Sequence, residues 1–436
     1  MNAEPRILHT KAEDAFAALF AAAKGTLPGS SDVAAARQAA FAAFMASGLP
    51  HRRTEAWRYT DLRALLRAVP PVPGGTASVS ALQLALLPGL DRARLVVVDG
   101  VYRPELSDRA GLDGVAIDDV AALLAAGDKR IGAQVGQLDD AMVALNTALM
   151  AGGVSISVPD GFAVARPIEI AHVTTGVYAT HVRNSVTVGA GASLRLVETF
   201  AGPNDAAYLA NVVTEVTIGD GARVVFAKLQ ADGAAAMHLG TSAVTIGAEA
   251  ALDHLTLMTG AALSRSQSFI TFGGQFARAG LFGATMIGGR QHADIMLGVD
   301  HAVPNGASRE LFKAVMDGKA DGIFQGRILV RPGAQKTDGK MMTQGLLLSD
   351  DASFAVKPEL EIFADDVQCA HGATSGQIDE DMLFYLLSRG IPRPEAETLL
   401  VTAFLAEAIE GLGDEAIGAA FEVVARDWLA NRATVS

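Results

Sequence analysis

The 436-residue sequence contains only one cysteine, Cys369. A single cysteine excludes a disulfide within the chain. Together with an N-terminus that shows no basic-then-apolar leader, it predicts a reducing, cytoplasmic location. A chain of this length can bury a substantial core without covalent cross-links, so fold stability does not account for the cysteine.

Basic and aromatic residues are also scarce. The 48 acidic residues outnumber the 35 lysines and arginines, which gives a net charge of −13, and aromatic residues make up 6% of the chain. A polyanion such as DNA would be repelled except at a local basic patch, and few side chains are available to stack on bases. We therefore expect no nucleic-acid partner.

The sequence lacks a convincing membrane segment. Its longest charge-free run, residues 141–159, is about long enough to cross a bilayer. That run contains Asn146, Gly152 and Pro159, which make poor membrane helix. We expect no membrane-spanning segment.

From about residue 152 the sequence is rich in short β-prone runs and repeats itself. The segments SVTVGAGASLRLVE, EVTIGDGARVVFAK, AVTIGAEAALDHLTL and FITFGGQFARAGLF each contain two such runs joined at a glycine. Their first glycines, Gly189, Gly219, Gly247 and Gly273, are 30, 28 and 26 residues apart. A near-constant period predicts the stacked coils of a β-solenoid, because each coil buries its face only against its neighbours. A β-sandwich built from hairpins is the alternative.

Helical segments are predicted on both sides of this repetitive middle. Residues 11–24 and 32–46 are alanine-rich with apolar residues at helical spacing, and a turn with a further helix is expected within residues 51–70. Near the C-terminus, Asp379 is a plausible N-cap of a helix that Arg389 and Gly390 close. Two more helices are predicted at about 394–410 and 414–431.

These patterns divide the chain into four predicted segments. They are an N-terminal helical region (1–80), a small mixed α/β region (81–150), a β-helix core (151–375) and a C-terminal helical region (376–436).

The single cysteine lies two residues before His371, in the segment IFADDVQCAHGATSGQID. On a strand, residues i and i+2 project to the same face, so the thiol and the imidazole can be neighbours. Three interpretations stay open: a nucleophile with its base, a pair of metal ligands, or ordinary packing. A cysteine enzyme also needs an oxyanion site, for which the sequence has no signature. A metal site needs further ligands, which a second subunit could supply.

The apolar pattern around this pair changes phase. Leu360 and Ile362 occupy even positions, whereas Val367 and Cys369 occupy odd positions. A bend or bulge near residues 364–366 would reconcile the two phases. It would place His371 at the end of the final strands, just before the C-terminal helices.

Other chemical motifs are weak. The segment 333–341 has five residues between its glycines and a methionine after Lys340, so it does not match a phosphate-binding loop. The neighbouring residues His292 and Asp294 are conceivable metal ligands, as are Asp300 and His301. Both pairs are more typical of surface or turn groups.

The run QKTDGKMMTQGLLLSDDASFAVKPELEIFADDVQCAHGATSGQIDEDMLFYLLSRGI, residues 335–391, resembles the C-terminal signature of the SufB/SufD family of iron-sulfur cluster assembly proteins. EAWRYTDLRALL, LNTALMAGGVSISVPDG and the repeats follow the same family order. The single cysteine and the segment VQCAHGATSGQID resemble the SufD branch of the family and not the SufB branch. The segment MMTQGLLL differs from the family pattern, in which more polar residues are common at these positions.

The resemblance implies a right-handed parallel β-helix between helical ends. It implies a complex in which this chain pairs with SufB through the β-helix cores and binds one copy of the ATPase SufC through its C-terminal helices. The resemblance would also explain why this chain has no phosphate-binding loop, because the nucleotide site of the complex belongs to SufC. A homodimer of the isolated chain is left open.

By matching position, the resemblance also implies site residues. His371 corresponds to a family histidine implicated at the SufB interface in forming the nascent cluster, with a SufB thiolate as its counterpart, and can ligate iron. Cys369 matches the neighbouring family cysteine. The implied role is a non-catalytic scaffold that shares a transient iron-sulfur cluster with SufB and binds none when isolated. The alternatives are a purely structural partner without iron contact and a stand-alone cysteine-dependent enzyme.

Overall fold

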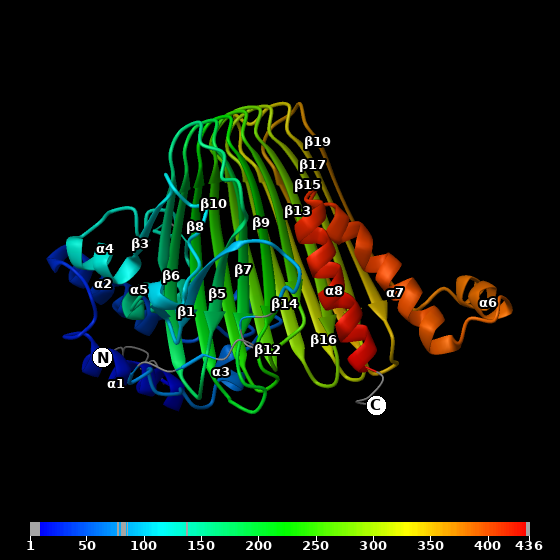
Figure 1. Ribbon diagram of the computed structural model, residues 1–436, viewed down its shortest axis with the longest axis horizontal. Helices are drawn as coiled ribbons and strands as arrows, with labels where there is room; N and C mark the ends of the chain where they lie inside the picture. Colours follow the sequence, from blue (N-terminus) through cyan, green and yellow to red (C-terminus); the bar gives the residue numbers. More distant parts are fainter. Residues whose placement is uncertain (1–8, 76–77, 80–83, 85, 137, 433–436) are drawn as a thin grey trace, which may run out of the picture.

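The computed structural model describes residues 9–75, 78–79, 84, 86–136 and 138–432. Two large β-sheets face each other, and most consecutive strands alternate between them, so the chain winds along the molecule coil by coil (Figure 1). In sheet order, sheet A contains β19 (Gln368–Gly376), β17 (Asp338–Leu347), β15 (Ala307–Met316), β13 (Arg278–Ile287), β11 (Ala251–Met258), β9 (Arg223–Ala231), β7 (Ser193–Ala201), β5 (Ile168–Val173), β1 (Ala93–Val98) and β2 (Val101–Tyr102). Sheet B contains β18 (Ser353–Ile362), β16 (Asp321–Val330), β14 (His292–His301), β12 (Leu263–Phe272), β10 (Met237–Ile246), β8 (Leu209–Ile218), β6 (Ala179–Val188), β4 (Val154–Val158) and β3 (Ala116–Asp119).

The strand pairs within both sheets are parallel except β1–β2 and β3–β4, which lie at the N-terminal end. The repeat glycines occupy the same corner of successive coils. The amide of Gly219 donates to the carbonyl of Val188 (2.8 Å), and the amide of Gly247 donates to the carbonyl of Ile218 (2.8 Å). The predicted β-solenoid is therefore confirmed, and the β-sandwich alternative is wrong.

The main core lies between the two sheets. On β7, Leu194, Leu196 and Phe200 point inward at alternate positions and are buried. Burial of each such side chain stabilises the fold by roughly 1.5–3 kcal/mol. Stacked coils repeat this arrangement along the solenoid, which is why the period seen in the sequence is close to constant.

The C-terminal helices cover the outer face of sheet A. Helices α7 (Arg393–Glu410) and α8 (Glu415–Arg432) bury Leu405 and Phe421 against strand residues such as Leu229 and Leu255. Helix α6 (Glu380–Ser388) extends away from this body (Figure 1). Its N-cap is Asp379, whose carboxylate accepts hydrogen bonds from the amides of Asp381 and Met382.

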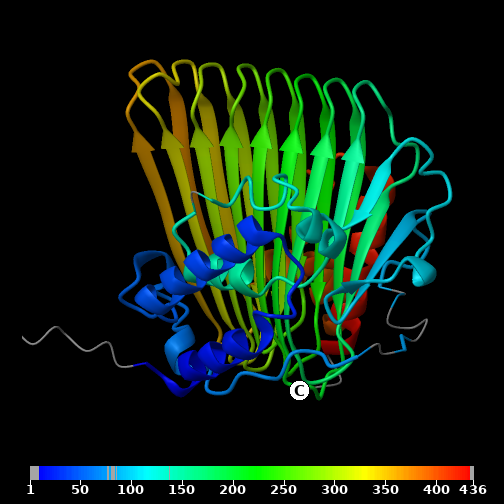
Figure 2. The same cartoon turned by 90° about the vertical axis from the view of Figure 1, so that its left-hand side faces the viewer.

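The N-terminal helices cover part of the outer face of sheet B, on the side opposite α7 and α8 (Figure 2). A capping box joins Thr10 and Glu13 at the start of α1. Phe16 and Phe44 pack with Leu239 and Leu263 of the sheet. The helical elements of this half are α1 (Lys11–Ala23), α2 (Ser31–Ser47), the 3-10 turn η1 (Glu55–Trp57), α3 (Leu62–Leu65), the 3-10 turn η3 (Pro104–Leu106), α4 (Val120–Ala126) and α5 (Ala141–Leu149).

The predicted helices at both ends are confirmed to within about two residues, which is the usual uncertainty of helix ends. Gly390 follows Arg389 with φ +83°, a conformation that glycine adopts without strain. Within the described residues, none of the helices combines the length and apolar character needed to cross a membrane. The four-segment division stays a prediction. Strand β1, inside the predicted mixed region, pairs in parallel with β5 and so continues sheet A.

Candidate functional site

The last coil of the solenoid has two open edges. In the described chain, β19 pairs only with β17 and β18 only with β16, so each leaves one edge of backbone groups without a neighbouring strand. Both sequence-predicted site residues lie on β19. The bend predicted near residues 364–366 is the corner at which the chain passes from β18 to β19. It is not a bulge within one strand.

Cys369 is half-buried at this end. It packs against the main core and lies in register with Gly339 of β17. Burial raises the pKa of the Cys369 thiol, a hydrogen bond with the backbone of Gly339 opposes this shift, and the negative charge of Asp338 adds to it. The thiol is therefore protonated near neutral pH and is a poor nucleophile.

His371 is exposed, in register with the buried Met341. Strand alternation places its side chain on the same face as that of Cys369, the face that turns toward the solenoid interior in earlier coils. Within the described residues, no hydrogen bond joins the imidazole to the thiol, so the structure brings the two residues together without forming a nucleophile–base pair.

Iron ligation at this end would require ligands in addition to those that the described residues gather there. Among the described residues there is no group of three or more His, Cys, Asp or Glu side chains that could hold a metal ion. Cys369 and His371 offer one thiol and one imidazole, donor types found in iron-sulfur proteins. They would supply two ligands of an iron site, and the remaining ligands would have to come from other groups.

Sequence reasoning missed a third group near this end, Glu310 on β15. Its backbone is in register with Met341, which is in register with His371, so the three residues form one column across β15, β17 and β19. Glu310 is 2% exposed, and neither carboxylate oxygen forms a hydrogen bond within the described part of the chain. Burial raises the pKa of Glu310 to about 8. The hydroxyl of Ser308 and the charge of Arg309 act against this rise in the pKa of Glu310, and the same hydroxyl also contacts His301 (3.0 Å).

A signal for Glu310 is present in the sequence. In ASRELFKAVM the inward positions are Ser308, Glu310, Phe312 and Ala314, so a charged residue occupies an apolar phase. Which of the alternate positions face inward can be recognised only once the strand register is known.

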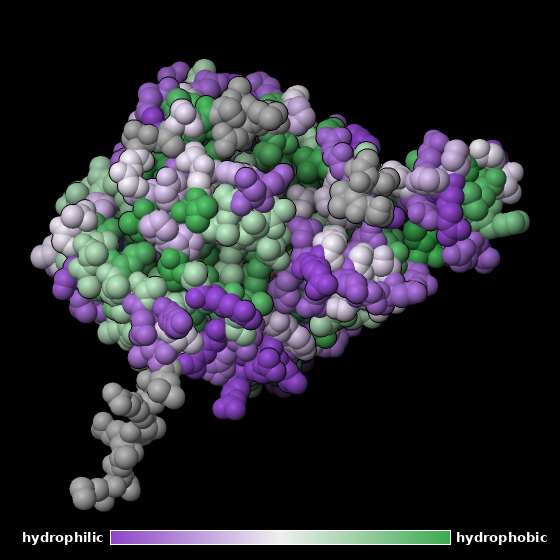
Figure 3. Space-filling view, turned by 90° about the horizontal axis from the view of Figure 1, so that it is seen from below, coloured by the Kyte–Doolittle hydropathy of each residue, from purple (hydrophilic) through white to green (hydrophobic). Residues whose placement is uncertain are grey.

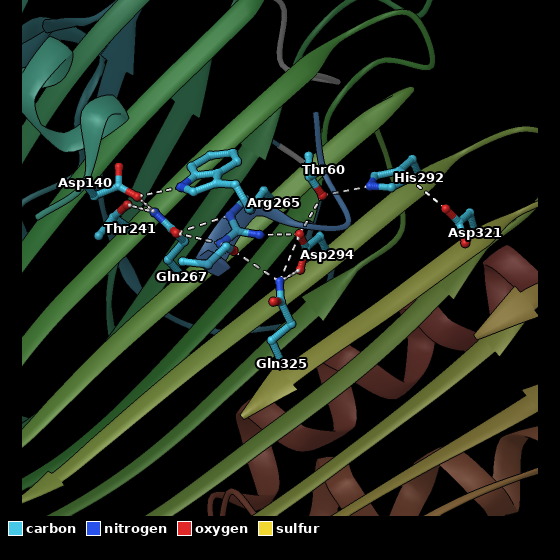
Figure 4. A network of polar contacts seen from close by, with 11 residues as sticks. Thr60, Asp140, Thr241, Arg265, Gln267, His292, Asp294, Asp321 and Gln325 are labelled. Atoms are coloured by element: carbon cyan, nitrogen blue, oxygen red, sulfur yellow. Dashed lines mark hydrogen bonds and ion pairs between the residues drawn. The ribbon is translucent and has the colours of Figure 1, made fainter. Parts of the chain in front are cut away.

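The weak metal candidates have structural roles instead. His292 contacts Asp321 (3.0 Å) and the hydroxyl of Thr60 (2.9 Å), and Asp294 pairs with Arg265 (Figure 4). Near the C-terminal end of β14, Asp300 pairs with Arg331 (2.6 Å).

The same network attaches the segment EAWRYTDL to sheet B. The guanidinium of Arg265 lies 4.0 Å from the centre of the Trp57 ring and donates to the carbonyl of Ala56 (2.6 Å). The Trp57 indole donates to Asp140 (3.0 Å), and the Thr60 hydroxyl donates to Asp294 (2.5 Å) (Figure 4). Because Arg265 and Asp294 are fully buried and paired, this network stabilises the docking of the segment and offers no accessible site.

Comparisons with known proteins agree with this architecture. Residues 172–404 match the family model described as "SUF system FeS cluster assembly, SufBD core domain", and residues 10–170 match the "SufBD protein N-terminal region". The chain is 31% identical to an iron-sulfur cluster assembly SufBD family protein of Synechocystis, over 83% of each chain. It is 30% identical to the iron-sulfur cluster assembly protein SufD of Escherichia coli, over 85% of this chain and 87% of that protein. It is 28% identical to SufD of Bacillus subtilis, over 63% of this chain and 64% of that protein.

Proposed function

The chain belongs to the SufBD family of SUF-system iron-sulfur cluster assembly proteins, and from this premise we propose that it is a non-catalytic scaffold subunit. It pairs with SufB, helps to build a transient iron-sulfur cluster and docks the ATPase SufC. The cluster is the cargo of the complex and not a resident group of the isolated chain. The complex works in the cytoplasm.

The observation that carries the proposal is the place of His371, exposed on the last strand of the solenoid. Open strand edges such as those of β18 and β19 favour pairing with another chain, because their backbone donors and acceptors are not yet used. A SufB coil stacked on this end would bring its thiolate toward His371. It would also cover Cys369 and shield the new site from water.

Within that site, His371 is the first iron ligand we propose and Cys369 the second. A neutral imidazole can bind iron directly. The thiol of Cys369 must first lose a proton, which its raised pKa opposes. The competing proposal is a purely structural subunit that holds SufB and SufC while neither residue touches iron.

Helix α6 supports the docking of SufC. The exposed fractions of Met382, Phe384 and Tyr385 on the protruding α6 are 58%, 72% and 55%, and that of Leu399 on α7 is 48%. Figure 3 shows apolar patches on this arm, at the right of the view. Exposed apolar side chains gathered on a projecting element are typical of a protein-binding surface.

The test is His371→Ala in a chain co-produced with SufB and SufC. We expect the complex to assemble with normal subunit ratios on size-exclusion chromatography while its iron and acid-labile sulfide content falls several-fold. Ser375→Ala, on the same face of β19, is the matched control and should leave the cluster intact. Normal cluster content in His371→Ala would favour the purely structural subunit.

SufC docking has its own test in the same co-production. Phe384→Glu places a charge in the exposed apolar surface of α6. We expect it to remove SufC from the purified complex while SufB stays bound, and retention of SufC would contradict docking through α6.

A further inference from the structure

A groove on the underside of the molecule has no part in the proposed function. It has a volume of about 440 Å³ and lies between the segment that follows α3 and the turns that precede β8, β10, β12 and β14. Figure 3 views this underside, where apolar areas alternate with hydrophilic ones. The groove is lined mainly by apolar side chains, namely Leu65, Leu66, Pro70, Leu209, Met237 and Leu263.

Two arginines on its rim are without ionic partners. Arg67 and Arg290 both line the groove and are exposed, and neither forms an ion pair with any residue that the structure describes. The other polar side chains of the lining already have partners: His292 contacts Asp321 and Thr60, and the hydroxyl of Tyr208 donates to Asp232. Although the whole chain carries a net charge of −13, these two guanidinium groups give the groove a local positive charge; one of them, Arg67, also donates to the carbonyl of Ala64 (3.4 Å).

This combination has the composition of a small-ligand site. Such sites span roughly 300–1,000 Å³, are mostly apolar and contain a few polar groups that fix orientation. Guanidinium groups bind carboxylates, sulfonates and phosphates through paired hydrogen bonds. A second surface groove, lined by α1 and residues 69–72, is apolar but contains no charged group, so nothing there selects a ligand.

We propose that the groove between Arg67 and Arg290 binds a small organic anion with an apolar body. The negatively charged group lies between the two guanidinium groups, and the apolar body covers the floor formed by Leu209, Met237 and Leu263. Binding at this place is independent of the open end of the solenoid, and so it does not require a SufB partner.

The test uses 8-anilinonaphthalene-1-sulfonate, an aromatic sulfonate whose fluorescence rises in apolar surroundings, with the full chain. We expect one saturable site that decanoate displaces. In the double variant Arg67→Gln/Arg290→Gln the affinity should fall by about tenfold or more, because the anion loses both cationic partners. Ala262→Glu, which places a carboxylate at an exposed position of the groove wall, should weaken binding similarly.

Two controls separate this site from other surfaces. Arg426→Gln removes an exposed arginine from α8 and should leave binding unchanged. N-phenyl-1-naphthylamine, a neutral analogue, should not distinguish wild type from the double variant. Equal affinity of wild type and both groove variants for the sulfonate would overturn the proposal. The proposal would also be overturned if the chain bound phosphatidylglycerol vesicles while decanoate failed to displace the probe. The surface would then recognise a membrane and not a small anion.

Discussion

Two carboxyl groups lie inside the same solenoid and differ in their partners. Glu198 on β7 is fully buried, and burial alone would raise its pKa, but the ammonium of Lys228 at 3.0 Å holds the pKa well below its usual range. The side chains of Asn184 and Thr214 donate to the same carboxylate (2.8 and 2.6 Å). Glu310 on β15 is almost as enclosed but forms no ion pair within the described residues, and burial raises its pKa to about 8 against the weaker effects of Ser308 and Arg309.

The difference between Glu198 and Glu310 corresponds to a difference between the middle coils of the solenoid and its last coils. In the middle coils the buried carboxylates of Glu198, Glu215 and Asp294 are paired with cations of the same chain, as expected where an unpaired buried charge costs several kcal/mol. Glu310 lies two strands from the open edge, at a backbone separation from His371 of roughly 10 Å given the usual strand spacing. Glu310, a buried carboxyl group that forms no ion pair among the described residues, therefore lies near the end that we propose another chain completes.

The largest effect is expected from removing the cation in the middle. Lys228→Met leaves Glu198 buried without its counter-charge and should lower the free energy of unfolding by about 3–5 kcal/mol. Thermal and urea denaturation measure the change. Adding Glu198→Gln should recover part of the loss. If Lys228→Met destabilised the chain no more than an exposed substitution, the contrast between middle and end would be wrong.

The second-largest effect, expected from replacing Glu310, is an increase in the free energy of unfolding that depends on pH. The folded chain keeps the Glu310 proton up to about pH 8, whereas the unfolded chain releases it above its ordinary pKa of 4.5. Unfolding therefore releases a proton in this window, and stability falls as the pH rises through it. Glu310→Gln should stabilise the chain on the order of 3 kcal/mol at pH 8.5 and little at pH 5. Denaturation midpoints of both proteins at the two pH values test this, and an equal difference at both would contradict it.

The smallest effect is expected at the open end itself. Cys369 is half-buried and its thiol has a hydrogen bond with the backbone of Gly339, so Cys369→Ala, which removes this one contact and little packing, should cost about 1 kcal/mol or less. Cluster content of the complex with SufB should fall less than in His371→Ala. A larger loss in Cys369→Ala than in His371→Ala would reverse the order of the two ligands that we propose.

Much of the fold could be predicted because it depends on local repetition. Stacked coils force Gly219 and Gly247 into the same corner, so a period in the sequence becomes a period in space. Helix ends could be located because side chains such as Asp379 satisfy nearby backbone groups. These signals act over a few residues, or over one coil.

Features that depend on distant contacts could not be predicted. Strand β1 joins sheet A beside β5 although no repeat marks it. Trp57 stacks on Arg265, which lies far along the chain. The pair Cys369 and His371 was found because its chemistry stands out in the sequence, whereas Glu310 was missed because its inward direction follows from a strand register that the sequence does not display.

The central claim is that His371 donates to iron at the end of the solenoid. Its most direct test is pulsed electron paramagnetic resonance of the reduced cluster in a complex reassembled from ¹⁵N-histidine-labelled chain with unlabelled SufB and SufC. We predict a ¹⁵N hyperfine coupling that disappears in His371→Ala. A spectrum without ¹⁵N coupling, or one that His371→Ala leaves unchanged, would contradict the claim.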